Sequence, residues 1–233
     1  MSEPDLKGAW DSSYARHENF LFWPSDEGVK FFSRYLRRRV GIDEIVDVLP
    51  GAKGSRMVDV GCGIGHYLTF GTEMGMEMDR NDISTKAIET ARHYLAQKVG
   101  PVANERALQG DIQKLPWAEG FFAHAMSDSV LDSMPFEVAQ VGTTEIARIT
   151  RPGGYFYCTL ISGDETGRDP DFCGELVVEG KHEHGTIQSY FNYVKIKRLL
   201  EPFFEIQNCS LIQVRNQASK THHGRWHVVA RRR

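Results

Sequence analysis

The chain has few cysteines and no long apolar run, and each shortage excludes a class of protein. Of its 233 residues only four are cysteines, and they lie too far apart to indicate a zinc site or a disulfide framework. No apolar stretch approaches the length of a membrane span, and Met1–Trp10 lacks the apolar core of a secretory signal. The net charge of -3 gives no general attraction to nucleic acid. We therefore expect a cytoplasmic protein with reduced thiols that does not bind membranes.

A glycine-rich turn is the most informative feature that is present. In the sequence MVDVGCGIGHY, Asp59 precedes Gly61 and Gly63 at the end of an apolar strand, and Cys62 lies between them as a small packing residue. Glycines permit a tight turn that a ligand can approach closely. A dinucleotide site would need a small residue where His66 stands, and a carboxylate would repel a pyrophosphate. Asp59 would instead attract an ammonium group, which favours S-adenosylmethionine.

Alternating strand and helix signals from residue 56 onward predict an α/β fold with a mainly parallel sheet. Strands are expected at 56–60, 75–82, 105–110, 121–127, 155–161, 204–214 and 225–230, the last two forming a hairpin. Helices are expected at 65–74, 84–99, 136–149 and 193–201. Residues 1–50, rich in aromatic side chains, are expected to form a helical cap on a domain at 51–233. A polar, glycine-containing insertion is expected at about 162–190.

Four motifs occur in the order found in class I S-adenosylmethionine-dependent methyltransferases, which the chain resembles over about residues 56–160. They are VDVGCGIGHY, NDIST at 81–85, GDIQKLPW at 110–117 and RPGG at 151–154. The resemblance implies a Rossmann-like sheet of seven strands whose last strand is antiparallel. It also implies cofactor roles for Asp59, Gly61 and Gly63 at the methionine end, Asp82 at the ribose, Asp111 at the adenine amino group, and Ile83 and Ile112 on either side of the adenine ring.

A carboxylate about 20 residues after a glycine turn can accept hydrogen bonds from both ribose hydroxyls. Asp79 and Glu77 rival Asp82 on spacing, but Asp82 also stands at a helix start. Taken by itself, Asp111 could equally be a simple turn residue that binds no ligand. The chain departs from the family at strand four, where the usual acid is absent and His124 follows, which we interpret as a core histidine.

Methyl transfer depends mainly on positioning and water exclusion, so no catalytic triad is required. If the acceptor carries a proton, a general base would help, and the candidates are Asp128, His182, Glu183 and His184. Ser127 and Asp128 lie at the carboxyl end of strand four, where either could face the cofactor or the substrate. The insertion, including Tyr190, is the expected substrate-contacting segment, although it could equally be a plain polar loop.

Two further groups of residues could have either a functional or a purely structural role. Tyr14, Phe20 and Trp23 in the aromatic N-terminal segment could close over the cofactor as a lid, with Tyr14 and Trp23 as candidate substrate contacts, although packing is their commoner role. The histidines at 182, 184, 222 and 223 lack a convergent carboxylate at a recognised spacing, so no metal is expected.

The leading hypothesis is a methyltransferase acting on an oxygen or nitrogen of a small molecule, as a monomer or homodimer. An RNA methyltransferase that uses the cluster Arg34–Arg39 to hold phosphates is a less favoured alternative, because the sequence shows neither an appended nucleic-acid module nor a strong basic surface. A second alternative is a protein that binds the cofactor without catalysis. A nicotinamide-dependent enzyme is a distant fourth.

Overall fold

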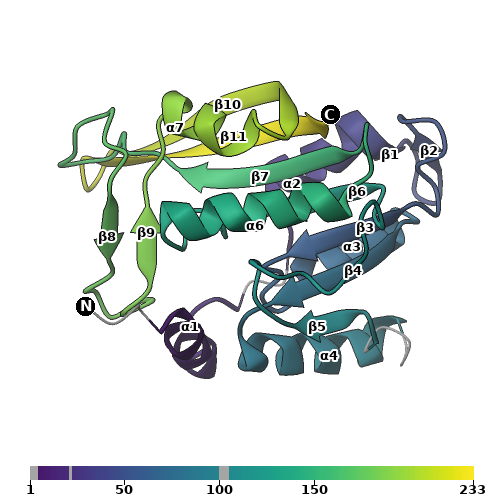
Figure 1. The fold of residues 1–233 in the computed structure, drawn as a ribbon, viewed down its shortest axis with the longest axis horizontal. Helices are drawn as coiled ribbons and strands as arrows, with labels where there is room; N and C mark the ends of the chain where they lie inside the picture. The colour runs from purple at the N-terminus through teal and green to yellow at the C-terminus, as the bar shows by residue number, and fades with distance from the viewer. Residues whose placement is uncertain (1–4, 21–22, 100–104) are drawn as a thin grey trace.

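A seven-stranded sheet runs through the molecule, which we describe from a computed structural model covering residues 5–20, 23–99 and 105–233 (Figure 1). The strand order is β10-β11-β7-β6-β3-β4-β5. The strands are β3 (Arg56–Val60), β4 (Glu77–Asp82), β5 (Ala107–Gln109), β6 (His124–Ser127), β7 (Tyr155–Ile161), β10 (Phe204–Asn216) and β11 (Thr221–Arg232). Neighbouring strands from β7 to β5 are parallel, and β11 is antiparallel to both β7 and β10. The predicted α/β fold with an antiparallel last strand is confirmed.

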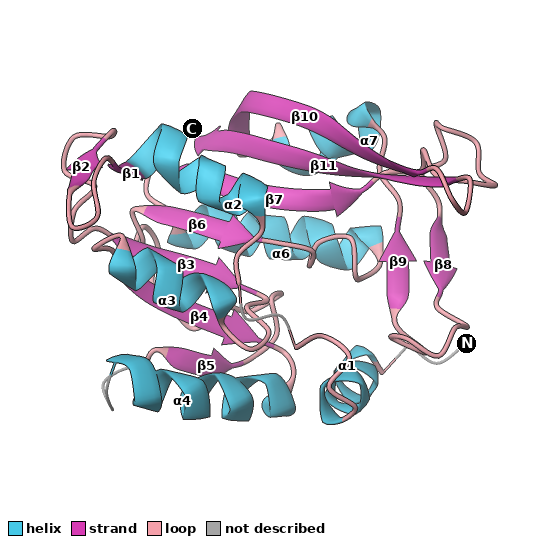
Figure 2. Cartoon of the chain, turned by 180° about the vertical axis from the view of Figure 1, so that it is seen from behind, coloured by secondary structure: helices cyan, strands magenta, loops and turns pink. Residues whose placement is uncertain are grey.

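Helices cover both faces of this sheet. They are α3 (His66–Glu73), α4 (Thr85–Val99), α6 (Phe136–Ile149) and α7 (Tyr193–Leu200). On one face α6 and α7 bury the main apolar cluster against β3, β6 and β7 (Figure 1). On the other face α3 and the N-terminal segment bury a second cluster (Figure 2). Helix α4 packs against β4 and β5 at the sheet edge, and the Ser84 hydroxyl accepts the Ala87 N–H at 3.1 Å to begin it.

The N-terminal segment contains α1 (Leu6–Ala15), α2 (Asp26–Phe31), the π-helix η1 (Phe32–Leu36) and a short hairpin of β1 (Arg37–Arg39) and β2 (Ile45–Asp47). The predicted helical cap is present up to Leu36. The hairpin was not predicted, because three-residue strands are too short to show alternation. Phe31 and Phe32 share the second apolar cluster with β3 and α3, so this part of the cap is packed into the sheet.

The insertion after β7 contains a second hairpin, β8 (Glu175–Val177) and β9 (Ile187–Ser189), which projects from the sheet toward α1 (Figure 1). Elsewhere the predicted element boundaries differ by a few residues. The third strand is shorter than expected, at 107–109, and part of the segment before it lies outside the described residues. The fourth strand begins at His124 rather than at 121, with Phe122 forming only an isolated bridge to Thr150. No helix in the described part of the chain is long and apolar enough to cross a membrane.

Candidate cofactor and acceptor site

A cavity of about 430 Å³ lies at the carboxyl ends of β3, β4 and β6, between the sheet edge, α1 and the insertion. Figure 2 shows these strand ends pointing toward α1 and the β8–β9 hairpin. The carboxyl edge is where open α/β sheets bind ligands. The volume lies within the range of small-molecule sites, so one cavity could hold a cofactor and part of an acceptor.

The glycine turn forms the floor of this cavity. Gly61 has φ +75° and Gly63 φ +53°, a region that side-chain-bearing residues rarely adopt. A Cβ on Gly61 would lie 2.3 Å from the Val130 side chain, and a Cβ on Gly63 would lie 2.5 Å from the Tyr14 hydroxyl. Cys62 is also in the cavity wall, but its thiol is buried and packs among apolar side chains. Glycine is therefore favoured at both positions by conformation, and at Gly61 it is also required by space.

Asp82 lies at the end of β4 with its carboxylate turned back to the glycine turn. One oxygen accepts the Gly63 N–H and the other the Ser84 N–H, both at 2.8 Å. Each oxygen keeps a lone pair that could receive one hydroxyl of a vicinal diol. Burial raises the pKa of Asp82 to about 6, although these hydrogen bonds oppose that change.

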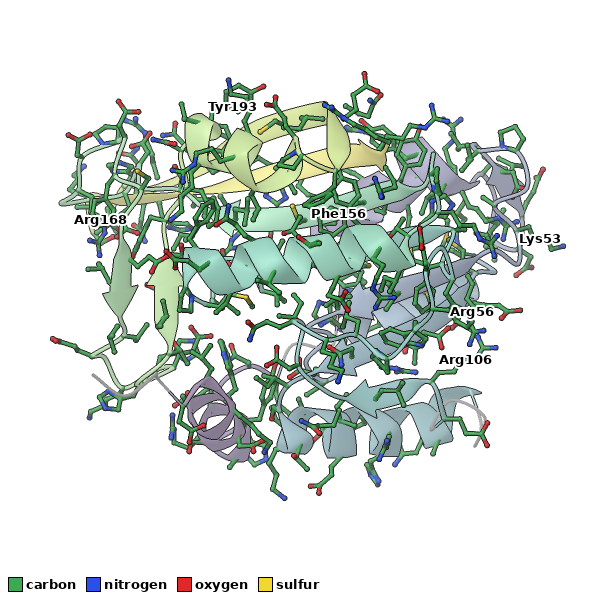
Figure 3. All side chains as sticks on the ribbon, in the orientation of Figure 1. Lys53, Arg56, Arg106, Phe156, Arg168 and Tyr193 are labelled. Carbon is green, nitrogen blue, oxygen red and sulfur yellow. The ribbon has the colours of Figure 1, made fainter. Side chains whose placement is uncertain are left out.

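The two rivals of Asp82 are engaged elsewhere. Both oxygens of Asp79 accept from Arg56, at 2.6 and 3.0 Å, and Glu77 accepts from Arg106 at 3.0 Å. Neither acid lines the cavity. Figure 3 shows Arg56 and Arg106 at the side of the molecule opposite the insertion. Of the three acids, the structure therefore places only Asp82 in the cavity.

The predicted adenine residues also line the cavity. Ile83, Asp111 and Ile112 are all in its wall. Asp111 additionally acts as a turn residue, because its Oδ1 accepts the Gln113 N–H at 2.8 Å. The two interpretations of Asp111 are thus compatible in one geometry.

Two predicted cofactor residues lie behind the wall rather than on it. Asp59 is 3% exposed, and its Oδ2 has no hydrogen-bond partner among the described residues. Burial, together with the charge of Asp128, raises the pKa of Asp59 to about 8. Ser127 is completely buried and is also absent from the cavity lining. Either residue could contact a ligand only through a shift of the wall, and the raised pKa of Asp59 leaves its carboxyl largely protonated at neutral pH.

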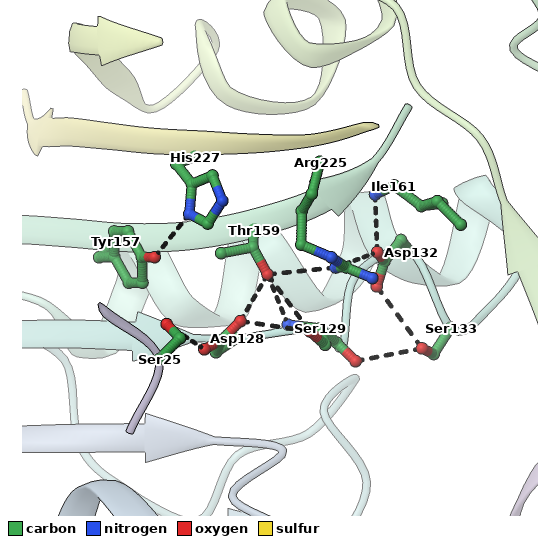
Figure 4. Close-up of polar contacts among 10 residues, drawn as sticks. All are labelled: Ser25, Asp128, Ser129, Asp132, Ser133, Tyr157, Thr159, Ile161, Arg225 and His227. Atoms are coloured by element: carbon green, nitrogen blue, oxygen red, sulfur yellow. Dashed lines mark hydrogen bonds and ion pairs between the residues drawn. The ribbon is translucent and has the colours of Figure 1, made fainter. Parts of the chain in front are cut away.

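Asp128 is the centre of a hydrogen-bond network at the far end of the cavity (Figure 4). Its oxygens accept from Tyr67 and Thr159, each at 2.6 Å, and from Ser25 at 3.3 Å and Ser129 at 3.2 Å. Burial alone would raise the pKa of Asp128, but the hydrogen bonds from Thr159 and Tyr67 outweigh it and hold that pKa below its ordinary value. An ionised carboxylate with four donors is a weak base.

Arg225 and His227 project from β11 into the same end of the cavity and were not predicted as site residues. Residues two apart on a strand face the same side, so the alternation in the last strand could have pointed to them. Arg225 Nη1 donates to Asp132 at 2.8 Å and to Thr159 at 3.3 Å. Nδ1 of His227 lies 2.9 Å from the Tyr157 hydroxyl (Figure 4). His66, at the start of α3, also lines the cavity and was not predicted as a site residue.

The insertion supplies less of the site than predicted. Glu183 lines the cavity in a left-handed conformation with φ +56°, and its N–H donates to Glu18 at 2.9 Å. His182 and His184 do not line the cavity. Tyr190 is 2% exposed and donates to Gln188 at 3.1 Å, so it serves the packing of the insertion. Arg168 of the insertion takes part in this packing, since its guanidinium carbon lies 4.5 Å from the centre of the Tyr190 ring (Figure 3).

The N-terminal segment covers the cavity as the lid interpretation requires. Tyr14 and Trp10 of α1 and the largely exposed Trp23 all line it. Asp11 holds α1 against α4, because its Oδ1 accepts from the Ser84 hydroxyl at 2.7 Å and from the Lys86 N–H at 3.2 Å.

His124 lies away from the cavity, at the other end of β6, where its Nδ1 accepts the Tyr155 N–H at 3.1 Å. Burial beside Arg151 lowers the pKa of His124 to about 4, in agreement with a core histidine.

A comparison with protein families agrees with this geometry. A family model described as a methyltransferase domain matches residues 58–158, which include the glycine turn, Asp82, Asp111 and Asp128. Those residues form a class I S-adenosylmethionine-dependent methyltransferase domain. The predicted family is thereby confirmed. Arg225, His227 and the whole N-terminal segment lie outside the matched range.

Relatives and solved structures extend the likeness. Over 132 residues the chain is 30% identical to a malonyl-[acyl-carrier protein] O-methyltransferase of Pectobacterium atrosepticum, covering 55% of this chain and 47% of that protein. It is 32% identical over 114 residues to a fatty-acid O-methyltransferase of Mycolicibacterium smegmatis, covering 46% and 37%. The chain thus spans about half or less of the length of these relatives.

The Burkholderia thailandensis 1,6-didemethyltoxoflavin-N1-methyltransferase, solved with S-adenosylhomocysteine, shares the fold. Its TM-score is 0.70 at 15% identity, with 100% of this chain and 91% of that chain covered. At this identity the likeness concerns the fold alone.

Proposed function

We propose that the protein transfers a methyl group from S-adenosylmethionine to an oxygen or nitrogen atom of a small-molecule acceptor. One observation carries the proposal: a single cavity joins the glycine turn and Asp82 to a second, differently lined end beside Asp128, Arg225 and His227. A cofactor bound at the first end would leave the second for an acceptor.

The residues present fit this cofactor. Asp82 would accept from the ribose hydroxyls, and Asp111 from the adenine amino group between Ile83 and Ile112. Asp128 supplies negative charge on the side where an ammonium and a sulfonium would lie, and a bound cation would favour ionisation of the buried Asp59. The bound cofactor would supply the electrophilic methyl group. Water exclusion would come from α1, because Tyr14 closes directly over Gly63.

The apolar part of the cavity lining favours an acceptor with an apolar body. It comes from α1, the N-terminal segment, the loop before α6 and α6 itself, namely Leu6, Trp10, Trp23, Met134 and Val138. Near Asp128 and Arg225 the lining is polar, and polar groups beside an apolar wall are the usual pattern of a small-molecule pocket. The named relatives methylate oxygen and the structural neighbour methylates nitrogen, so both acceptor atoms remain within the proposal.

The structure weakens the RNA alternative. Arg37, in the middle of the arginine cluster, is 4% exposed and pairs with Asp47 at 2.7 Å. A buried, paired arginine cannot neutralise phosphates, so the cluster is smaller than the sequence indicated.

Calorimetric titration with S-adenosylhomocysteine tests the cofactor site. We expect micromolar-range binding that Asp82→Ala weakens by about 1.5–3 kcal/mol, the usual size for a hydrogen bond to a charged group. The control is Asp43→Ala, which removes an exposed carboxylate outside the cavity and should bind as the wild type does. No binding by the intact protein would overturn the proposal. If the protein binds S-adenosylhomocysteine, transfer of a labelled methyl group from S-adenosylmethionine to a molecule in a cell extract would distinguish an enzyme from a protein that only binds the cofactor.

A further inference from the structure

His227 is held in the acceptor end of the cavity by one ring nitrogen only. Nδ1 contacts the Tyr157 hydroxyl at 2.9 Å, and the two rings stack with centroids 6.4 Å apart at 29°. Tyr157 is 1% exposed, so the contact is fixed from within the sheet. Within the described part of the chain, Nε2 has no hydrogen-bond partner. Nε2 is therefore the nitrogen available to a bound molecule (Figure 4).

The surroundings of His227 keep its imidazole neutral. Burial lowers its pKa, and Arg225 and Lys30 act in the same direction, while the carboxylates Asp128 and Glu27 oppose them. Burial also raises the pKa of Tyr157, whose hydroxyl therefore stays protonated. A neutral histidine with one oriented nitrogen is suited to accept a proton.

The other candidate bases are less well placed. Asp128 is ionised but already accepts four hydrogen bonds, and His182 and His184 do not line the cavity. His66 and Glu183 also line the cavity, but among the described residues no hydrogen bond orients the His66 ring, and the Glu183 carboxylate lies 3.7 Å from Nε2 of His182.

We propose that His227 is the general base of the reaction and that Tyr157 positions it. This rests on the proposed methyl transfer. Nε2 of His227 takes the proton of the acceptor as the acceptor's lone pair forms the new bond to the methyl carbon. The electron pair of the broken sulfur–carbon bond stays on sulfur, and the imidazolium later releases its proton to water. In the tautomer that this step requires, Nδ1–H donates to the Tyr157 oxygen.

The charged side chains around His227 favour an acceptor whose reacting oxygen or nitrogen carries a proton. The positive charge of Arg225 is already paired with Asp132 at 2.8 Å, and Asp128 adds a second negative charge nearby. A sulfonium would balance this excess, so a neutral acceptor leaves the site near neutrality. A carboxylate acceptor would add an uncompensated negative charge beside Asp128. The geometry thus favours a phenol-like hydroxyl or a ring N–H on an apolar body.

Nuclear magnetic resonance of the histidine rings tests the base without any acceptor. The protein is labelled with ¹⁵N and saturated with S-adenosylhomocysteine, and the His227 signals are assigned by their loss in His227→Gln. We expect a neutral ring at pH 7.5 with Nε2 unprotonated, and a changed tautomer or pKa in Tyr157→Phe. A proton on Nε2 at that pH, or no response to Tyr157→Phe, would overturn the proposal. Absence of S-adenosylhomocysteine binding would instead contradict the proposed cofactor site.

Rates with defined acceptors test the acceptor class. With 2-naphthol as probe, His227→Gln should lower kcat by about 100- to 1,000-fold and remove the acid limb of the pH profile, while S-adenosylhomocysteine binds as before. His223→Gln, on the same strand but outside the cavity, is the matched control. Transfer confined to octanoic acid, or loss of the acid limb in His66→Gln rather than in His227→Gln, would overturn the inference.

Discussion

The carboxylate of Asp82 accepts the N–H of Gly63 at 2.8 Å, which ties the end of β4 to the glycine turn after β3. The residue proposed to bind the ribose therefore also holds the turn that forms the cavity floor. Its second oxygen accepts the Ser84 N–H just before α4 begins. Protonation of this one side chain would disturb the turn, the helix start and the cofactor together.

The affinity for S-adenosylhomocysteine should depend on pH through Asp82. In the folded protein the pKa of Asp82 is about 6, above its ordinary value of 3.8. Without ligand, the contribution of Asp82 to the free energy of unfolding therefore falls as pH rises from about 4 to 6. Ribose hydroxyls bind the ionised form, so ligand affinity changes in the opposite sense. We expect binding to weaken about tenfold between pH 7.5 and pH 5, measured by calorimetry. Asp82→Asn should bind weakly at both values with a flatter dependence, and an equal pH dependence in that variant would exclude Asp82 as its source.

Gly61→Ala should abolish cofactor binding, because the added Cβ would lie 2.3 Å from Val130 at a residue with φ +75°. Gly51→Ala is the matched control, since Gly51 has φ +79° and nothing lies within 4 Å of an added Cβ. The left-handed conformation costs each variant about 1–2 kcal/mol of stability. Only Gly61→Ala should lose affinity for S-adenosylhomocysteine. Equal affinities of the two folded variants would show that the turn is not the ligand floor.

The ion pair of Arg225 with Asp132 should stabilise the fold as well as shape the site. Asp132 is 3% exposed and accepts both Arg225 Nη1 at 2.8 Å and the Ile161 N–H at 2.7 Å. Asp132→Asn should lower the free energy of unfolding by about 1–3 kcal/mol, because buried donors lose a charged acceptor. The exposed pair of Lys86 with Glu89 is the control, and Glu89→Gln should change stability by less than about 1 kcal/mol in urea unfolding. Similar losses in both variants would contradict the buried role.

The sheet could be predicted because its information is local. Strand β7 and helix α6 have the predicted bounds, since apolar periodicity and the Pro152-Gly153 break define them without reference to the rest of the chain. Strands β10 and β11 extend beyond their predicted ends, because they pair with each other past the edge of β7. Pairing of this kind depends on a partner strand and leaves little signal in either sequence alone.

The cofactor end of the site was also accessible from sequence, because the glycine turn, Asp82 and Asp111 lie in short motifs. The acceptor end was not. Arg225 and His227 reach the cavity only because β11 inserts between β10 and β7, which brings residues near the end of the chain beside the carboxyl end of β6. Conversely, the polar insertion was expected to contact the substrate, yet Tyr190 is buried within the insertion and donates to Gln188 there. Long-range placement decides which polar residues meet.

Helix α1 should control access to the cofactor site through Asp11. The Asp11 carboxylate accepts from the Ser84 hydroxyl at 2.7 Å and from the Lys86 N–H at 3.2 Å, and it also pairs with Lys7 at 2.6 Å. Asp11→Ala removes the link to α4, so we expect faster amide exchange in α1 and a three- to tenfold weaker affinity for S-adenosylhomocysteine, about 0.7–1.4 kcal/mol.

Lys7→Ala is the control for this lid, because it removes only the exposed ion pair and leaves the contacts with α4 in place. It should leave exchange and affinity close to those of the wild type. Deletion of Met1–Trp23 should have a larger effect than Asp11→Ala, since it also removes Trp10 and the Tyr14 ring above Gly63. If the truncated protein is folded and binds S-adenosylhomocysteine with unchanged affinity, α1 covers the cavity without contributing to ligand binding.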